Sequence, residues 1–280
     1  MSLSVFLMVI AAAILHAGWN VLVKINADKI VTITLIKVTQ ICLALMLIPF
    51  VEFPAQAAWP YMVSSAVIHT AYFYALTMSY RLGEFGYVYP VSRGTAPLVV
   101  AAGSTIMIGE LLTDLQILSI CLIAGGIMSL AFAKGNAMRD PKALGFALVT
   151  GICIAGYTLM DGIGARLTTS PESYIVWLML VNGLPILAIS LLLRGEKFVP
   201  QIVANWKVGA LAGLVSIIAY GLVIWASTLA PIAMVSAIRE TSMVFAIALG
   251  VFFLHERFSY MQLVGVSIAL SGIFLLHGLA

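Results

Sequence analysis

The stretch "SRGTAPLVVAAGSTIMIGE", residues 92–110, has a counterpart 146 positions further along the chain, "IRETSMVFAIALGVFFLHE", residues 238–256. This shift brings identical residues into register: Arg93 and Arg239, Thr95 and Thr241, Ala102 and Ala248, Glu110 and Glu256, Gln116 and Gln262, and Gly126 and Gly272. A shift of 138 likewise pairs Ala17-Gly18-Trp19 with Ala155-Gly156-Tyr157. The matches predict two related halves, residues 1–135 and 143–280, joined by a basic linker at residues 136–142.

The composition is that of a membrane protein. Hydrophobic residues make up 62% of the 280 residues and charged residues only 9%, and the mean hydropathy is +1.12. A spanning helix takes about 20 apolar residues, so ten such helices fit, with short connections and no room for a soluble domain. The apolar runs do not alternate with polar residues as transmembrane β-strands do. We therefore expect an all-α polytopic membrane protein with helices near residues 3–24, 30–51, 59–80, 85–108, 114–133, 143–165, 173–193, 207–229, 231–253 and 259–279.

Basic residues are unevenly distributed over the predicted loops. The loops after even-numbered helices contain one, Arg166. Those after odd-numbered helices contain Lys24, Lys29, Arg81, Lys134, Arg139, Lys142, Arg194, Lys197, Lys207 and Arg257. Because cytoplasmic loops are enriched in lysine and arginine, both termini are predicted to lie outside the cytoplasm, with the chain in a bacterial-type inner membrane. The start of the chain lacks the basic segment of a signal peptide, so the first helix is expected to remain in the protein.

Five helices in each half have a topological consequence. Because five is odd, the second half must enter the membrane upside down relative to the first. Such inverted repeats are typical of secondary transporters, whose substrate site lies near the bilayer midplane between the repeats. The chain has no Walker-A loop for ATP. The pattern therefore predicts a carrier that works by alternating access without ATP.

Several short motifs recur in both halves. They are Pro90-Val91, Gly109-Glu110 and Gly125-Gly126 in the first half, and Ala230-Pro231, Glu256, Gly265 and Gly272 in the second. With the repeat and the helix count, they resemble the EamA-type drug/metabolite transporter superfamily. The resemblance implies a five-plus-five inverted fold that moves small metabolites by alternating access. It also implies cytoplasmic termini, whereas the loop charges predict external ones.

The first predicted helix contains a narrower resemblance. Its segment "HAGWNVLVK", residues 16–24, is similar to a branch of the superfamily with an H-A-x-W-N start. Members of that branch have been associated with phosphonate utilisation, which implies a phosphonate-related substrate.

Arg93 and Arg239 are the leading candidates for substrate binding. Each lies about eight residues into its predicted helix, roughly 12 Å deep, where an ionised side chain is costly unless it lines water or has a partner. We expect the two to face the crevice between the halves and to hold an anionic group. The alternative is internal pairing, of Arg93 with Asp161 or Glu84. A pair between Arg239 and Glu240 is disfavoured, because adjacent helix positions point about 100° apart.

Two prolines flank the first arginine. Pro90 and Pro97 are expected to free backbone carbonyls in the helix that carries Arg93, because proline has no N–H to donate. Freed carbonyls of this kind are tolerated where they line a transport path.

The other candidates are polar and aromatic side chains that share helix faces. The predicted substrate-binding residues are His16, Trp19, Asn20, His69, Tyr72, Tyr89, Tyr157, Asp161 and Tyr220, together with the two arginines. Asp161, Glu240 and His16 are also the candidates for proton coupling. For the aromatic and histidine residues, the alternative is a packing role or a place in the interfacial belt.

Mixed charge at the expected site suits a zwitterionic or anionic metabolite such as an amino acid or an aminophosphonate. The alternative is an exporter of amino acids or lipophilic amines that uses an aromatic pocket. The two hypotheses differ in the role of the arginines. Only the transport of a zwitterionic or anionic metabolite requires their positive charges.

An enzyme is not expected. The segment "HERFS", residues 255–259, lacks the second histidine of a zinc-protease motif, and the chain has no G-x-S-x-G elbow. Cys42, Cys121 and Cys153 lack metal-ligand spacing. We therefore expect no catalytic residue, no metal and no cofactor. The expected partners are the small-molecule substrate and the lipid bilayer, without nucleic acid, and both repeats in one chain predict a monomer.

Overall fold

The computed structural model describes residues 1–25, 29–132, 140–195, 198–254 and 259–278. Within these ranges every regular element is a helix, with no strand, which confirms the predicted all-α class. The α-helices are α1 Leu3–Ile25, α2 Lys29–Leu47, α3 Trp59–Leu82, α4 Phe85–Ile108, α5 Asp114–Ser129, α6 Pro141–Arg166, α7 Pro171–Arg194, α8 Phe198–Leu229, α9 Ile232–Arg239, α10 Ser242–Leu254 and α11 Tyr260–Gly278. Lys134, Arg139, Lys197, Glu256 and Arg257, which contribute to the charge and repeat patterns, lie outside the described residues.

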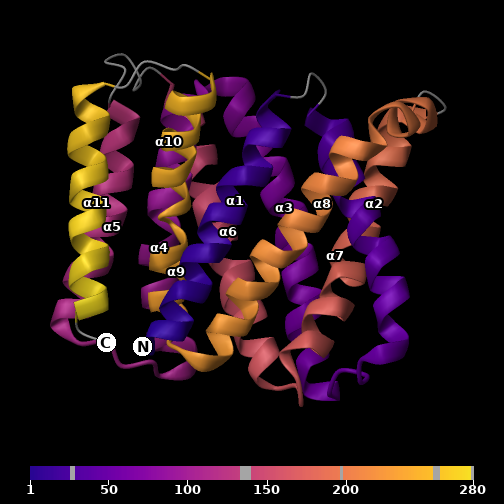
Figure 1. The fold of residues 1–280 in the computed structure, drawn as a ribbon, viewed down its shortest axis with the longest axis horizontal. Coiled ribbons are helices and arrows are strands. Elements are labelled where there is room, and N and C mark those ends of the chain that lie inside the picture. The colour runs from indigo at the N-terminus through magenta and orange to yellow at the C-terminus, as the bar shows by residue number, and fades with distance from the viewer. Residues whose placement is uncertain (26–28, 133–139, 196–197, 255–258, 279–280) are drawn as a thin grey trace.

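Nine stretches of the described residues are long and apolar enough to cross a membrane, and α9 together with α10 forms one of them. α3 runs alongside these helices (Figure 1) but is less apolar, because Ser65, His69 and Thr70 interrupt its apolar residues. The prediction of a polytopic membrane protein is confirmed.

The helices stand side by side, with α5 and α11 at one end of the bundle and α2 and α7 at the other (Figure 1). The two halves of the chain are interleaved, since α3 packs on α6, α1 on α8, and α5 on α11. The start of α1 and the end of α11 lie at the same edge of the bundle (Figure 1), as an even number of crossings requires. The inverted relation of the halves and their boundaries at residues 135 and 143 stay predictions.

A capping box begins the last helix of each half. Before α5, the Gln116 backbone N–H donates to Thr113 Oγ1 at 3.3 Å, and the Thr113 N–H donates to Gln116 Oε1 at 3.0 Å. Before α11, the Gln262 backbone N–H donates to Ser259 Oγ at 3.2 Å, and the Ser259 N–H donates to Gln262 Oε1 at 2.9 Å. Each box satisfies two backbone donors that a helix start leaves free. The boxes lie 146 positions apart, which is the shift that relates the two halves of the sequence.

The ninth predicted helix is interrupted. Residues 231–253 were expected to form one helix, but α9 ends at Arg239 and α10 begins at Ser242. In the turn between them, the Glu240 and Thr241 N–H groups donate to carbonyls three residues earlier, at 3.1 and 2.9 Å. By contrast α4, which contains Pro90 and Pro97, is assigned as one continuous helix. The interruption therefore occurs in the half that has no proline at the equivalent positions.

Glycines allow α5 and α11 to approach closely. A Cβ atom added to Gly126 would lie 2.6 Å from the Ala269 backbone nitrogen and 2.7 Å from the Gly265 carbonyl oxygen. A Cβ on Gly272 would lie 2.7 Å from the Ser119 carbonyl oxygen. The close contact is in line with the use of small residues at helix contacts in membranes.

Gly126→Val is expected to lower the free energy of unfolding by about 1–3 kcal/mol, because the added side chain would push α11 away from α5. Gly125→Val is the matched control, since an added Cβ there meets nothing within 4 Å. Thermal unfolding of the two variants in detergent measures the difference. Equal losses in both variants would contradict the close contact between α5 and α11.

Reporter fusions test the predicted orientation. Alkaline phosphatase, which folds only outside the cytoplasm, is expected to be active when fused after Ala280 and inactive when fused after Asp140, in the linker between the halves. Green fluorescent protein at the same two positions should give the opposite result. The reverse of both patterns would place the termini in the cytoplasm.

Candidate functional site

Three charged side chains meet in the bundle interior where α4 approaches the turn between α9 and α10. Glu240 Oε2 lies 2.8 Å from Arg93 Nε, and Glu240 Oε1 lies 3.5 Å from Arg239 Nη2. Glu240 is fully buried, and Arg93 and Arg239 are only 4% and 3% exposed. One carboxylate therefore serves two arginines, which leaves one formal positive charge in excess. We call Arg93, Arg239 and Glu240 the arginine cluster.

The arginine cluster leaves several of its polar atoms without aligned hydrogen bonds. Arg93 Nη2 donates to Ser242 Oγ at 3.0 Å, and Arg239 Nη1 donates to Thr158 Oγ1 at 3.4 Å. The 2.8 Å contact of Arg93 with Glu240 is an ion pair rather than an aligned hydrogen bond, and neither arginine Nε has a hydrogen-bond acceptor among the described residues. Buried donors of this kind can bind an anionic oxygen.

Internal pairing of the arginines does not follow the sequence-based prediction. The partner of Arg93 is Glu240, whereas the prediction named Asp161 and Glu84. Glu84 is exposed at the start of α4. The contact of Glu240 with Arg239 was disfavoured on regular helix geometry. It forms because the turn after α9 releases Glu240 from that geometry, although 3.5 Å is long for such a pair.

Asp161 has a separate set of partners. Its carboxylate accepts hydrogen bonds from the Tyr174 hydroxyl at 3.1 Å and from the Tyr220 hydroxyl. It is 1% exposed. The three residues come from α6, α7 and α8, so this carboxylate links three helices of the second half.

An aromatic cluster surrounds Tyr157. The His69 ring stacks on it with centroids 3.9 Å apart, and Tyr72 and Tyr220 lie edge-on to it at 5.8 and 6.1 Å. Tyr157 is buried and adjoins Thr158, which binds Arg239. The structure thus brings four predicted site residues, His69, Tyr72, Tyr157 and Tyr220, into one group beside the arginine cluster.

The predicted residues of α1 lie less centrally. His16 is within electrostatic range of both arginines, and its ring lies 5.2 Å from that of Trp19. Asn20 donates to the His16 carbonyl oxygen of its own helix at 2.7 Å. Among the described contacts, Trp19 and Asn20 therefore reach neither cluster.

Tyr89 lies on α4, one turn before Arg93. Its ring stacks on Phe85 at 4.9 Å, and it is within electrostatic range of Arg93 and Glu240. It borders the arginine cluster without a direct hydrogen bond to it among the described residues.

A polar pocket opens between α2, α3, α7 and α8, next to the aromatic cluster. Lys37, Gln40, His69, Asn182 and Tyr220 form its polar wall. Lys37, Gln40, Asn182 and Tyr174 are not among the site residues predicted from the sequence. The available signal was a polar side chain inside an apolar run, which Lys37, Gln40 and Asn182 all share.

Nothing in the described part of the chain resembles a metal centre. Histidine, cysteine, aspartate and glutamate side chains do not gather there in groups of three that could hold an ion. The chemistry available to the interior is therefore ion pairing, hydrogen bonding and aromatic contact.

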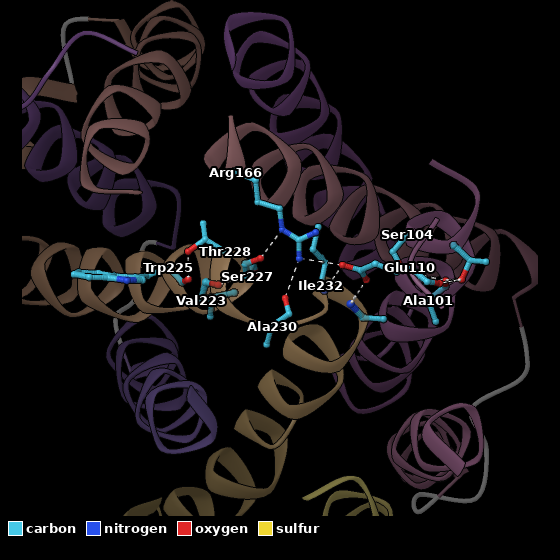
Figure 2. A network of polar contacts seen from close by, with 12 residues as sticks. Ala101, Ser104, Glu110, Arg166, Val223, Trp225, Ser227, Thr228, Ala230 and Ile232 are labelled. Carbon is cyan, nitrogen blue, oxygen red and sulfur yellow. Dashed lines mark hydrogen bonds and ion pairs between the residues drawn. The ribbon is translucent and has the colours of Figure 1, made fainter. Parts of the chain in front are cut away.

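A second charged network, the clasp, closes the end of the bundle where the termini lie. Arg166, at the end of α6, donates to Glu110 at 3.0 Å, to the Ala230 carbonyl at 2.9 Å and to the Ser227 carbonyl at 2.8 Å. Glu110, after α4, also accepts the Ile232 backbone N–H at 3.0 Å. Figure 2 shows these side chains converging between the end of α8 and the start of α9. Arg166 thus satisfies carbonyl groups at the C-terminal end of α8. Glu110 satisfies a backbone N–H group at the start of α9.

Nearby loops strengthen the same end of the bundle. Ser173 donates to the Glu52 carbonyl oxygen at 2.6 Å, and Thr169 donates to the Glu52 carboxylate. The loop after α2 is therefore tied to the loop after α6, as the clasp ties the loop after α4 to the loop after α8.

Comparisons with known proteins give a consistent result. Residues 141–278 match the EamA-like transporter family. The chain is 25% identical over 201 residues, 65% of its length, to "Uncharacterized transporter sll0355" of Synechocystis sp., and the match spans 60% of that relative. A crystal structure of another protein is similar over 100% of this chain and 98% of its own, with a TM-score of 0.73 and 14% identity. That last likeness concerns the fold alone.

Glu240→Gln is expected to lower the free energy of unfolding by about 3–5 kcal/mol, because it leaves two buried arginines without their shared carboxylate. Glu84→Gln, at an exposed position, is the control and should change stability little. Chemical denaturation of both purified variants measures the difference. A Glu240→Gln protein as stable as the wild type would show that the arginines do not depend on that carboxylate.

Proposed function

We propose that the chain is a secondary transporter of a small zwitterionic or anionic metabolite, because residues 141–278 match the EamA-like transporter family. Transport would proceed by alternating access, without ATP. The observation that carries this proposal is the arginine cluster, in which two buried arginines share a single carboxylate. The narrower H-A-x-W-N branch stays a prediction.

The charges of the interior favour an anion over a cation. Arg93, Arg239 and Lys37 are opposed there by Asp161 and Glu240, so one formal positive charge is in excess among the described residues. An isolated charge in the membrane interior is costly. A bound carboxylate or phosphonate would therefore be stabilised, whereas a purely cationic ligand would add to the excess.

A zwitterion also finds an acceptor for its ammonium group. Glu240 and Asp161 are both buried, and the rings of Tyr72 and Tyr157, which contact each other, offer apolar surface to the rest of the ligand. An amino acid or an aminophosphonate has this combination of groups. His16, Asp161 and Glu240 stay the candidates for proton coupling.

The clasp supports a closed state in the proposed cycle. In the predicted orientation, Arg166 and Glu110 lie at the outer face, so their contacts would close the path to the outside. Alternating access would require the clasp to open when the path opens outward. Because both halves lie in one chain, a monomer in the lipid bilayer suffices for this cycle.

The alternative function is export of amino acids or lipophilic amines. The aromatic cluster of His69, Tyr72, Tyr157 and Tyr220 favours it, since aromatic faces attract organic cations. The two functions differ in whether they need the arginine charges.

Ligand-induced thermal shifts test the proposal. Wild type, Arg93→Gln and Arg239→Gln would be screened against amino acids, aminophosphonates, phosphate esters and quaternary amines. Anionic or zwitterionic ligands are expected to raise the melting temperature of the wild type. Each substitution should weaken their binding about 10- to 100-fold, which corresponds to the loss of a charged hydrogen bond worth about 1.5–3 kcal/mol. Arg81→Gln, at an exposed position at the end of α3, is the matched control.

Transport measurements complete the test. Proteoliposomes loaded with a ligand that binds should accumulate the labelled ligand by counterflow without ATP, and the two arginine variants should lose this activity. If lipophilic amines stabilise the wild type and both variants equally, this result would contradict the paired-arginine site and favour the exporter.

A further inference from the structure

The polar pocket is built like a ligand site. Its cavity volume is ≈ 40 Å³ and it is in part open to solvent, so it suits a small molecule rather than a drug-sized ligand. Its apolar lining consists of Ile175, Leu178, Met179, Ile217 and Ile224. An apolar cavity with a few convergent polar groups is the usual form of such a site.

Lys37 supplies a positive charge to this pocket. Its Nζ donates to Gln40 Oε1 at 2.9 Å, a neutral partner, and this is its one hydrogen bond among the described residues. The opposite charge that acts on it is that of Asp161, whose carboxylate already accepts hydrogen bonds from Tyr174 and Tyr220. A lysine within a membrane span calls for an anionic partner, which a ligand carboxylate would provide.

Asn182 supplies an unfilled acceptor. The side chain is 5% exposed, and its Nδ2 lies 3.4 Å from His69 Nδ1. Its Oδ1 is buried in the pocket region without a hydrogen-bond donor among the described residues. Buried carbonyl oxygens are rarely left in this state. A hydroxyl or ammonium group on a ligand would satisfy it.

We propose that this pocket is a second binding site for the transported molecule, and that it selects a small acid with a hydroxyl or amino group beside its carboxylate. Lys37 binds the carboxylate and Asn182 accepts the hydrogen bond of the neighbouring group. In the present conformation Glu240 pairs with both arginines. The polar pocket is therefore the binding site that is available to the substrate. This inference rests on the proposed function and adds to it the substrate class and a second binding site.

Three simple acids of similar size test the selection. Lactate and alanine carry a donor beside the carboxylate, and propionate lacks it. Thermal-shift titrations of the purified full chain are expected to show that wild type binds lactate and alanine at least about tenfold more tightly than propionate, the effect of one hydrogen bond to a buried acceptor.

Two substitutions separate the contributions of the pocket residues. Lys37→Met keeps the length of the side chain and should weaken binding of all three acids by about tenfold or more, since the charged contact is lost. Asn182→Leu keeps the size of the side chain. It should lower the affinity for lactate and alanine to that for propionate. Lys207→Met, at an exposed position on α8, should behave as wild type. If either pocket variant fails to fold, Asn182→Asp replaces it, and its added negative charge should weaken the binding of lactate and propionate but not that of alanine, whose ammonium group it attracts.

The outcomes distinguish this inference from the proposed function. Loss of acid binding in Arg93→Gln, with unchanged affinities in Lys37→Met and Asn182→Leu, would overturn the second site and leave the transporter proposal intact. Equal affinity of the wild type for lactate and propionate would overturn the selection by Asn182. Absence of binding by every anionic or zwitterionic ligand of both panels would overturn the proposed function itself.

Discussion

The burial of Glu240 between Arg93 and Arg239 is the constraint on which the interior of this protein depends. A charged side chain in a membrane span must find a partner, and here one carboxylate from the second half of the chain serves an arginine from each half. The contact holds α4 against the turn between α9 and α10. It also gives that turn a role, because a continuous helix would point Arg239 and Glu240 about 100° apart.

The shared carboxylate explains how a substrate could change the conformation. Glu240 cannot leave the arginines unless another anion takes its place, since two unpaired buried cations are strongly unfavourable. A substrate anion that competes for Arg93 would free Glu240 and loosen the contact between α4 and the C-terminal end of α9. The clasp of Arg166 and Glu110 lies at the end of the same helices, because Glu110 follows α4 and also binds the first N–H group of α9. Events at the arginine cluster and at the clasp therefore act on the same two helices.

Much of the fold could be predicted because length and hydropathy determine where helices cross a membrane. The site was less accessible, since the sequence contains no distances between helices. Arg93 and Arg239 were recognisable as buried charges. The pairing of both with Glu240 was not, because the sequence contains no proline that would indicate the turn after α9. Lys37 and Asn182 come from helices that meet only in the folded bundle. Matching positions of the repeat do not always have the same environment. Tyr74 matches Tyr220 in sequence, but Tyr74 is 63% exposed, whereas Tyr220 donates a hydrogen bond to Asp161.

The order of the polar groups through the bundle bears on what the path can carry. The arginine cluster lies on α4, α9 and the turn that follows, the aromatic cluster on α3, α6 and α8, and the polar pocket between α2, α3, α7 and α8. Tyr157 and His69 connect them, because Tyr157 adjoins the partner of Arg239 and His69 lines the pocket. A cation entering the aromatic cluster would meet Arg239 on one side and Lys37 on the other. An anion would meet a positive group on both sides, and this arrangement favours the anionic or zwitterionic substrate over the lipophilic amine.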